Sequence, residues 1–238
     1  MKVELLDHMG SDLSVVNAAR VSFEKTSEWV NQAELDESYY GPDSAVQPKL
    51  SDRDVKLIRY LAKHNHWTPF GHCFASFRVK APIFVARQLG KHQVGLVWNE
   101  VSRRYVDSEP EFYVPSEWRK RAENVKQGSS DEAVTEPINY RLAGPKTVEQ
   151  AYDRLVMHSQ DVYQELLEVG VCPEQARMVL PQSMLTEWVW SGSLAAFARV
   201  CKLRLDPHTQ KETRDVAEMI DAEMRRLFPV SWEALMET

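Results

Sequence analysis

The residues best suited to chemistry lie in one basic stretch, positions 87–105. Its fixed positive charges, Arg87, Lys91, Arg103 and Arg104, stand against one negative charge, Glu100, although the whole chain has a net charge of −6. Histidine, glutamine, asparagine, serine and tyrosine are interleaved with them. Arginine presents a forked set of donors that matches phosphate oxygens. The stretch therefore indicates a pocket for a phosphate and a planar polar ring, with a solvated charged surface as the alternative.

Another arginine that could take part in chemistry, Arg204, lies in a helix predicted over residues 193–205. At 100° per residue, Arg204 projects only about 20° from Phe197, which belongs to the apolar side of that helix. An arginine beside a buried face requires a partner, because burial of an unpaired charge is costly. The sequence leaves two kinds of partner open: an anionic ligand, or a carboxylate such as Asp206 or Glu212.

Three histidines, His64, His66 and His72, lie within nine residues and are candidate metal ligands. With His208 and Glu212, four residues apart on one face of a predicted helix, they suggest a metal-dependent hydrolase. No carboxylate or cysteine inside 64–72 completes a set of metal ligands, so a helix end followed by a turn is the favoured interpretation. This turn could also frame a ligand pocket.

Composition and charge exclude several classes of protein. The chain has 238 residues, of which 43% are hydrophobic and 27% charged, an ordinary balance for a packed core. An acidic chain is unlike a duplex-coating nucleic-acid binder, and no apolar run reaches the roughly 20 residues of a membrane helix. Three widely spaced cysteines without a CxxC pair indicate neither a disulfide framework nor a zinc ribbon. We expect a cytoplasmic protein, or one in the host-cell cytoplasm if its source is viral, without nucleic-acid or membrane partners.

The elements that must position these residues are helices mixed with a few strands. Apolar spacing predicts strands over 3–6, 72–80 and 101–106, and helices over 12–23, 51–62, 82–89, 148–169, 193–205 and 209–228. Pro173 begins a short helix that Pro181 interrupts. Residues 25–50 and 119–146 are predicted to be exposed excursions. The mixture predicts an α+β fold, a mixed or antiparallel sheet packed with helices, as a single domain over residues 1–238.

Several segments, in the same order, resemble the flavin-dependent thymidylate synthase family. The family signature, R-H-R-x2-S-x-N-E-x-S-x-R-Y, is similar to Lys91-His92-Gln93 followed by residues 99–105. Both flanking arginines and the first serine of the signature are replaced here, and one extra residue precedes Asn99. Further matches are the family turn H-x-T-P-F-x-H at 66–72, the helix at 82–88, and the segments 176–181, 203–212 and 228–234. The resemblance fails over 25–50 and 119–146.

The resemblance implies an activity and an assembly. The implied reaction is methylation of dUMP to dTMP, with methylenetetrahydrofolate as carbon donor, FAD as bound cofactor and NADPH as reductant. The implied assembly is a homotetramer that builds each active site from more than one chain. The alternative within the family is a protein that binds nucleotide or flavin without catalysis.

The resemblance also assigns roles to residues. Arg204 is the predicted catalytic residue, which stabilises dUMP ionised at its ring N3. No metal ligand is predicted. Ser102 is interpreted as a contact to phosphate or base, because no histidine–carboxylate pair is evident that would activate it as a nucleophile. The implied FAD contacts are Thr68, Lys91, His92, Gln93, Glu100 and Ser193, the last through its backbone. The implied dUMP contacts are Gln88, Lys91, Glu100, Val101, Ser102, Arg103, Arg104, Arg177 and Arg204.

Overall fold

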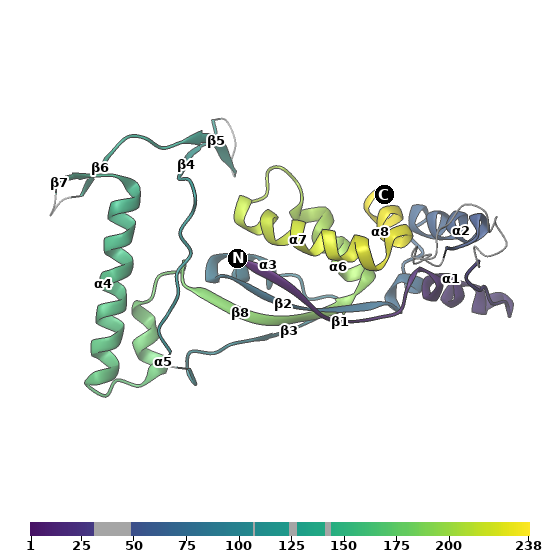
Figure 1. The fold of residues 1–238 in the computed structure, drawn as a ribbon, viewed down its shortest axis with the longest axis horizontal. Coiled ribbons are helices and arrows are strands. Elements are labelled where there is room, and N and C mark those ends of the chain that lie inside the picture. The colour runs from purple at the N-terminus through teal and green to yellow at the C-terminus, as the bar shows by residue number, and fades with distance from the viewer. Residues whose placement is uncertain (31–48, 107, 124–127, 141–143) are drawn as a thin grey trace, which may run out of the picture.

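The centre of the structure is an antiparallel sheet. The computed structural model describes residues 1–30, 49–106, 108–123, 128–140 and 144–238, and within these the sheet has four strands in the order β1-β2-β8-β3 (Figure 1). Strand β8 therefore pairs with both β2 and β3. The bounds are Lys2–Met9 for β1, Phe74–Pro82 for β2, Leu96–Glu100 for β3 and Leu185–Ser193 for β8.

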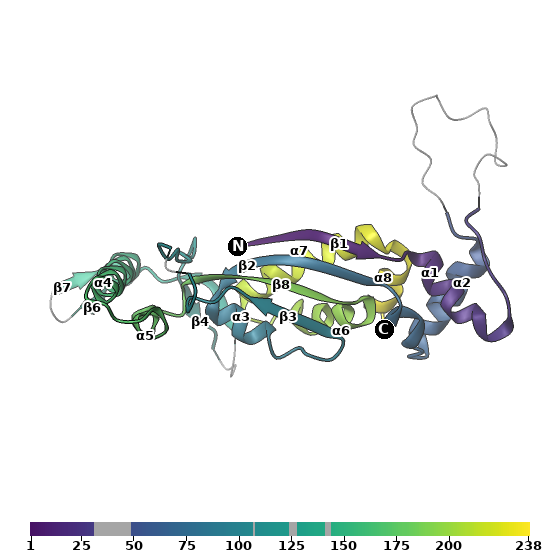
Figure 2. The same cartoon turned by 90° about the horizontal axis from the view of Figure 1, so that it is seen from below.

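Helices cover one face of this sheet, as the view from below shows (Figure 2). The covering helices are α3 (Ile83–Leu89), α6 (Leu194–Arg204), α7 (Lys211–Leu227) and α8 (Pro229–Met236). Two more helices pack beside α8 at one end of the sheet: α1 (Asp12–Arg20), which continues into the 3-10 turn η1 (Val21–Phe23), and α2 (Asp52–Lys63). The 3-10 turn η3 (Thr68–Gly71) leads from α2 into β2.

Alternation of buried and outward side chains along β2 and β8 builds the core under these helices. Phe77 and Trp190 are partners in the strand register, and both meet Phe197 of α6 edge to face, with ring centroids 5.2 and 5.4 Å away. Trp188 stacks on Trp98 of β3 at 4.3 Å. These aromatic contacts lock α6 and β3 onto β8, so they fix where the side chains at the ends of both elements lie.

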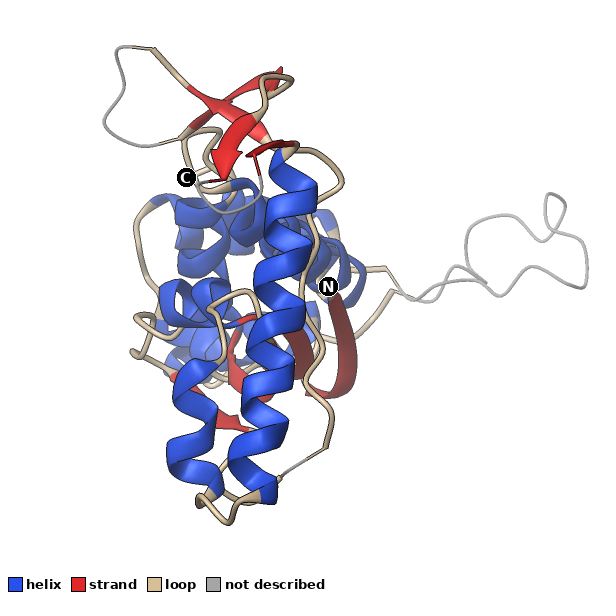
Figure 3. Cartoon of the chain, turned by 90° about the vertical axis from the view of Figure 1, so that its left-hand side faces the viewer, coloured by secondary structure: helices blue, strands red, loops and turns tan. Residues whose placement is uncertain are grey.

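Helices α4 (Val148–Glu168) and α5 (Pro173–Ala176) form an arm beyond one end of the sheet, where they lie side by side (Figures 1 and 3). The hydroxyl of Thr147 caps α4 by accepting the backbone N–H of Gln150 at 3.2 Å. The 3-10 turn η4 (Arg177–Val179) follows α5 and leads back towards β8. Two hairpins precede the arm: β4 (Arg119–Arg121) with β5 (Ser129–Ala133), and β6 (Ile138–Tyr140) with β7 (Gly144–Lys146).

The predicted α+β class with an antiparallel sheet is confirmed, but several elements differ from the prediction, among them β3 and α8, which were not predicted. The strand predicted over 101–106 is wrong, because pairing with β8 ends at Glu100 and residues 103–105 form a turn. The central strand β8 was not predicted at all. Within 119–146, where the sequence predicts an excursion, the described residues form the two hairpins. Of the excursion predicted over 25–50, residues 31–48 lie outside the described residues.

Asp12, which lies near the other end of the chain, caps the N-terminus of α8. Phe228 occupies the N-cap position and has no side-chain acceptor to offer. The buried carboxylate of Asp12 instead accepts the backbone N–H groups of Val230 and Ser231, each at 2.9 Å. A carboxylate at this position satisfies two otherwise unpaired donors and opposes the positive end of the helix dipole. Asp12 thereby joins α1 to α8.

We expect Asp12→Ala to lower the free energy of unfolding by about 1–3 kcal/mol, because two N–H groups at the start of α8 lose their acceptor. Asp52→Ala is the matched control, since Asp52 occupies the first turn of α2 but is exposed; its effect should stay within about 0.5 kcal/mol. Denaturant unfolding at one fixed protein concentration measures both. Equal losses in the two variants would contradict the capping role of Asp12.

Candidate functional site

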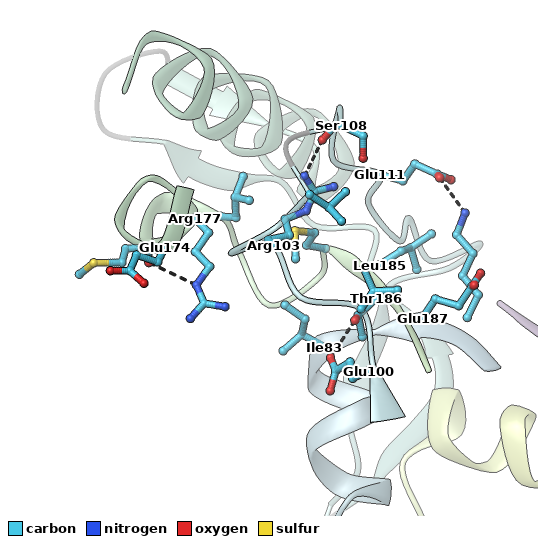
Figure 4. A pocket seen from close by; sticks show the side chains of 16 residues that line it. Ile83, Glu100, Arg103, Ser108, Glu111, Glu174, Arg177, Leu185, Thr186 and Glu187 are labelled. Atoms are coloured by element: carbon cyan, nitrogen blue, oxygen red, sulfur yellow. Dashed lines mark hydrogen bonds and ion pairs between the residues drawn. The ribbon is translucent and has the colours of Figure 1, made fainter. Parts of the chain in front are cut away.

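Six of the nine predicted nucleotide contacts line one of two separate cavities, and Lys91, Ser102 and Arg104 line neither. The first, of about 550 Å³, lies between the β3–β8 end of the sheet and the arm (Figure 4). Glu100 lines it from the sheet together with Thr186 of β8, whereas Arg103 and Arg177 line it from the turn after β3 and from η4. Val101 also lies in its wall. The structure therefore brings together four of the residues that the sequence proposed for one ligand.

Hydrogen bonds fix the carboxylate and leave the arginines available. Glu100 accepts the Thr186 hydroxyl at 2.7 Å and the indole N–H of Trp98 at 3.2 Å. Arg103 donates to the carbonyl of Ser108, and its guanidinium lies over the ring of Tyr163. Arg177 donates to a carbonyl, that of Glu174, at 3.3 Å. Among the described residues, neither arginine forms an ion pair, so both keep their charge and several donors for an anion.

Ser102 and Arg104 form a local contact beside this cavity. Arg104 Nε donates to Ser102 Oγ at 3.0 Å, and the exposed guanidinium lies over the ring of Tyr105. Neither residue lines the first cavity. In this arrangement the Ser102 hydroxyl serves as an acceptor for an arginine and has no general base among its described partners, which is consistent with a binding role.

The second cavity, of about 710 Å³, contains Arg204 and Gln88. No residue lines both it and the first cavity. Arg204 Nε donates to His92 Nε2 at 2.9 Å, and Nη2 donates to the backbone carbonyl of Gln88 at 3.3 Å. The side-chain oxygen of Gln88 is buried and has no hydrogen-bond partner among the described residues. Gln88 therefore lines the cavity and holds Arg204 through its backbone carbonyl, while its buried side-chain oxygen has no described partner.

The prediction that Asp206 or Glu212 is the partner of Arg204 is wrong, because each carboxylate pairs with another residue. Asp206 lies next to His208, with 3.0 Å between its oxygen and His208 Nδ1. Glu212 pairs with Arg119 at 2.7 Å. The helix α6 ends at Arg204, so Asp206 and Glu212 do not continue its face, and each carboxylate has another partner. Arg204 is instead held by an imidazole and a carbonyl.

The pKa of His92 shows that this imidazole is neutral. Burial lowers the pKa of His92 from its ordinary 6.5, and the positive charges of Arg204 and Arg199 lower it further. Because Nε2 accepts from Arg204, the ring proton is assigned to Nδ1. Burial also lowers the pKa of Arg204, but a guanidinium stays charged at neutral pH. The positive charge of Arg204 is thus oriented without being cancelled.

Except for Glu100, which lines the first cavity, the residues implied for FAD lie at or beside α6. Ser193 begins this helix; its hydroxyl accepts the Ala196 N–H, and its own backbone N–H donates to the Gly95 carbonyl, each at 3.2 Å. The turn η3, which holds exposed Thr68, packs against α6. The turn that carries Lys91, His92 and Gln93 is tied to the same helix by Arg204 and by Arg199, which donates to the Val94 carbonyl at 2.7 Å. From Leu194 to Arg204 the helix rises by about 15 Å.

The histidines do not form the arrangement that a hydrolase would need. Helix α7 begins at Lys211, so the prediction that His208 and Glu212 share one helix face is wrong. His64 and His66 are exposed, with ring centroids 6.3 Å apart. Among the described residues, no group of three or more histidine, cysteine, aspartate or glutamate side chains could hold a metal ion.

Within the same residues, no helix is long and apolar enough to cross a membrane.

Comparison with known proteins now identifies the class. A solved structure, the UMP/dUMP methylase PolB from Streptomyces cacaoi bound with 5-Br dUMP, superposes with a TM-score of 0.74 and 31% identity, over 99% of this chain and 94% of that one. The fold is therefore shared with a nucleotide methylase. The family model described as thymidylate synthase complementing protein matches residues 4–230.

Two relatives named flavin-dependent thymidylate synthase agree with this match. A protein from Thermus thermophilus is 37% identical over 235 residues, 99% of this chain and 75% of the relative. A protein from Thermosipho africanus is 34% identical over 238 residues, 99% and 90% of the two chains. The chain belongs to the thymidylate synthase complementing protein family, the flavin-dependent thymidylate synthases, as the resemblance of its motifs predicted.

Thr186 and Trp98, which hold the Glu100 carboxylate, were missed from the sequence. The signal for Thr186 lies in the alternation over 185–190, where Thr186, Trp188 and Trp190 recur every second residue. That period places Thr186 on the buried face of a strand whose partner carries Glu100. The sequence prediction omitted this strand, and so it omitted the residue that orients the carboxylate.

We expect Arg204→Met to raise the pKa of His92, because one of the two neighbouring charges that lower it is removed. The matched control is Lys202→Met, which removes an exposed charge from the same helix and should leave that pKa unchanged. An NMR titration of the imidazole nitrogens measures both. Since His92 binds protons less readily in the folded chain than in the unfolded one, its contribution to stability should decrease as the pH falls through 6.5. An unaltered His92 pKa in Arg204→Met would contradict the contact.

Proposed function

We propose that this protein methylates dUMP to dTMP, with methylenetetrahydrofolate as carbon donor and a bound FAD that NADPH reduces. The observation that carries the proposal is the charge of Arg204, which two neutral acceptors, the His92 imidazole and the Gln88 carbonyl, hold in the second cavity. Membership of the family supports it, as does the dUMP analogue in the related PolB structure. We place the reaction in the cytoplasm, or in the host-cell cytoplasm for a viral source.

The nucleotide would be held by two groups of residues. Arg103 and Arg177, which keep unpaired donors, suit the phosphate, with Ser102 and Arg104 beside them and Val101 as an apolar neighbour. The fixed Glu100 carboxylate suits a donor on the sugar or ring. Gln88 and Arg204 would face the pyrimidine from the other cavity, with Lys91 on the turn that follows α3. A cation beside N3 stabilises the ionised ring, an effect that is large where water is excluded.

The chain's own residues fit a flavin. Their distribution over about 15 Å along α6 suits an extended dinucleotide better than a single ring. Thr68 and the Ser193 backbone would contact it at one end, and Lys91, His92 and Gln93 at the other, with Glu100 nearby. When bound and reduced, FAD supplies the hydride of the reaction. The Nε2 atom of His92 already accepts a hydrogen bond from Arg204, so His92 has its Nδ1 proton left to donate to the flavin. Lys91 has a compact ammonium charge where the family signature has the forked guanidinium of an arginine.

A homotetramer would unite the two groups of nucleotide contacts. In one chain they line different cavities that share no residue. The exposed side chains of Met178 and Leu203, at the edges of the first and second cavity, are 79% and 55% accessible. Burial of such apolar surface favours association. We infer that a second copy brings Arg204 and Gln88 to the first cavity of its neighbour.

The activity is tested by turnover of dUMP with methylenetetrahydrofolate and NADPH, after loading with FAD. We expect dTMP, and we expect Arg204→Gln to lower its rate by about 100- to 1,000-fold with flavin content and melting temperature retained. Lys202→Gln, on the exposed side of α6, is the control and should stay active. A wild-type protein that binds flavin and dUMP but forms no dTMP would favour the non-catalytic alternative. An Arg204→Gln variant that is less stable yet fully active would remove Arg204 from catalysis.

The shared site is tested by mixing two inactive variants. Arg177→Ala damages one group of contacts and Arg204→Gln the other. If each site draws one group from each of two copies, random co-assembly leaves about a quarter of the sites intact, because each group is undamaged with a probability of about one half. We expect co-expression of the two variants to restore about that share of wild-type dTMP formation. No recovery in assemblies shown to contain both variants would contradict the shared site.

A further inference from the structure

The hairpin of β4 and β5 forms one wall of the Arg204 cavity, although it lies where the family motifs fail. Arg119 of β4, Ser129 of β5 and the preceding Gly128 line this cavity together with Leu203 and Arg204 of α6. The connection from α6 to α7 completes the wall between them. The distance between hairpin and helix therefore sets the width of the cavity in which Arg204 acts.

One guanidinium fastens both strands of the hairpin to α7. Arg119 Nη2 lies 2.7 Å from Glu212 Oε1 in the first turn of α7, and Arg119 Nε donates to Ser129 Oγ at 2.8 Å. Both charged side chains are buried, with 17% and 7% of their surfaces exposed. The hairpin also meets the connection between α6 and α7, because a side-chain carbon built at Gly128 would lie 3.8 Å from the His208 carbonyl oxygen.

The charges of Arg119 and Glu212 compensate each other within their ion pair. Burial raises the pKa of Glu212, but the hydrogen bonds from Arg119, its own backbone and Gln210, with the Arg119 charge, outweigh burial and lower that pKa overall. The second carboxylate oxygen accepts from Gln210 at 3.1 Å. Glu212 is therefore charged at neutral pH, and it compensates the charge of Arg119. Arg119 is thus suited to hold the wall in place, and Arg204 remains available to an anionic ligand.

We propose that Arg119 and Glu212 are positioning residues, whose buried ion pair holds the β4–β5 hairpin against α7 and thereby sets the affinity of the Arg204 cavity for dUMP. The inference rests on the proposed function, which places the pyrimidine beside Arg204. Loss of one partner leaves a buried charge unpaired, whereas replacement of both by apolar side chains does not. The single and double variants should consequently differ in a defined way.

The experiment measures hairpin order and dUMP affinity separately on the FAD-loaded full chain. Hydrogen exchange reports on the amides of 119–121 and 129–133, and calorimetry gives the Kd for dUMP. We expect Arg119→Met to speed exchange in the hairpin and to raise the Kd at least tenfold, with KM rising more than kcat falls. Glu212→Gln, nearly isosteric, provides the same test with less risk to folding. In the double variant Arg119→Met/Glu212→Met, the increase in hairpin exchange rate and the increase in the Kd for dUMP should each be at most half of that in Arg119→Met, on a logarithmic scale.

Lys120→Met is the matched control, because Lys120 belongs to the same hairpin but pairs only with exposed carboxylates, those of Glu132 and Glu136 at 3.6 Å, among the described residues. It should change neither exchange nor Kd. Faster hairpin exchange with an unchanged Kd would overturn the inference, as would a rise in KM confined to the folate. A wild-type protein that binds no dUMP would overturn the proposed function, and the inference with it; a changed Kd in the control alone would overturn only the inference.

Discussion

The site depends on how one positive charge is held without being neutralised. Arg204 ends α6, and its guanidinium donates to the imidazole of His92 and to the carbonyl of Gln88. A carboxylate in either position would fix the side chain equally well and would cancel the field that an anionic ligand needs. Because the pKa of His92 is lowered by burial and by its positive neighbours, the imidazole stays neutral and continues to accept. Orientation and charge are thereby obtained together.

The rest of the fold keeps that arrangement in place. Strand β8 runs directly into α6, so the sheet that places Thr186 beside Glu100 is continuous with the helix that ends at Arg204. The aromatic packing of Trp190 against Phe197 holds strand and helix together. The same connection separates the two cavities within one chain. On the proposed function, we infer that a second copy completes the site, because the predicted nucleotide contacts of one chain line two cavities that share no residue.

Local patterns in the sequence predicted most of the elements but not their partners. Helical spacing located α2, α4 and α6, and motif resemblance located the family. The sequence prediction had only a short helix from Pro173, interrupted at Pro181, before the helix that starts at Ser193; it omitted strand β8, although Thr186, Trp188 and Trp190 recur at the period of a strand. The partner of Arg204 was missed for a different reason: His92 lies 112 positions away, and only the tertiary fold brings the two together. Nearby carboxylates were the natural candidates from sequence, and both are used elsewhere.

The most direct test of this account is a crystal structure of the assembled protein with FAD and 5-bromo-dUMP. The account predicts a pyrimidine beside Arg204 and Gln88 of one copy and a phosphate beside Arg103 and Arg177 of another, with His92 still accepting from Arg204. A nucleotide enclosed by groups of a single copy, or bound away from Arg204, would contradict it.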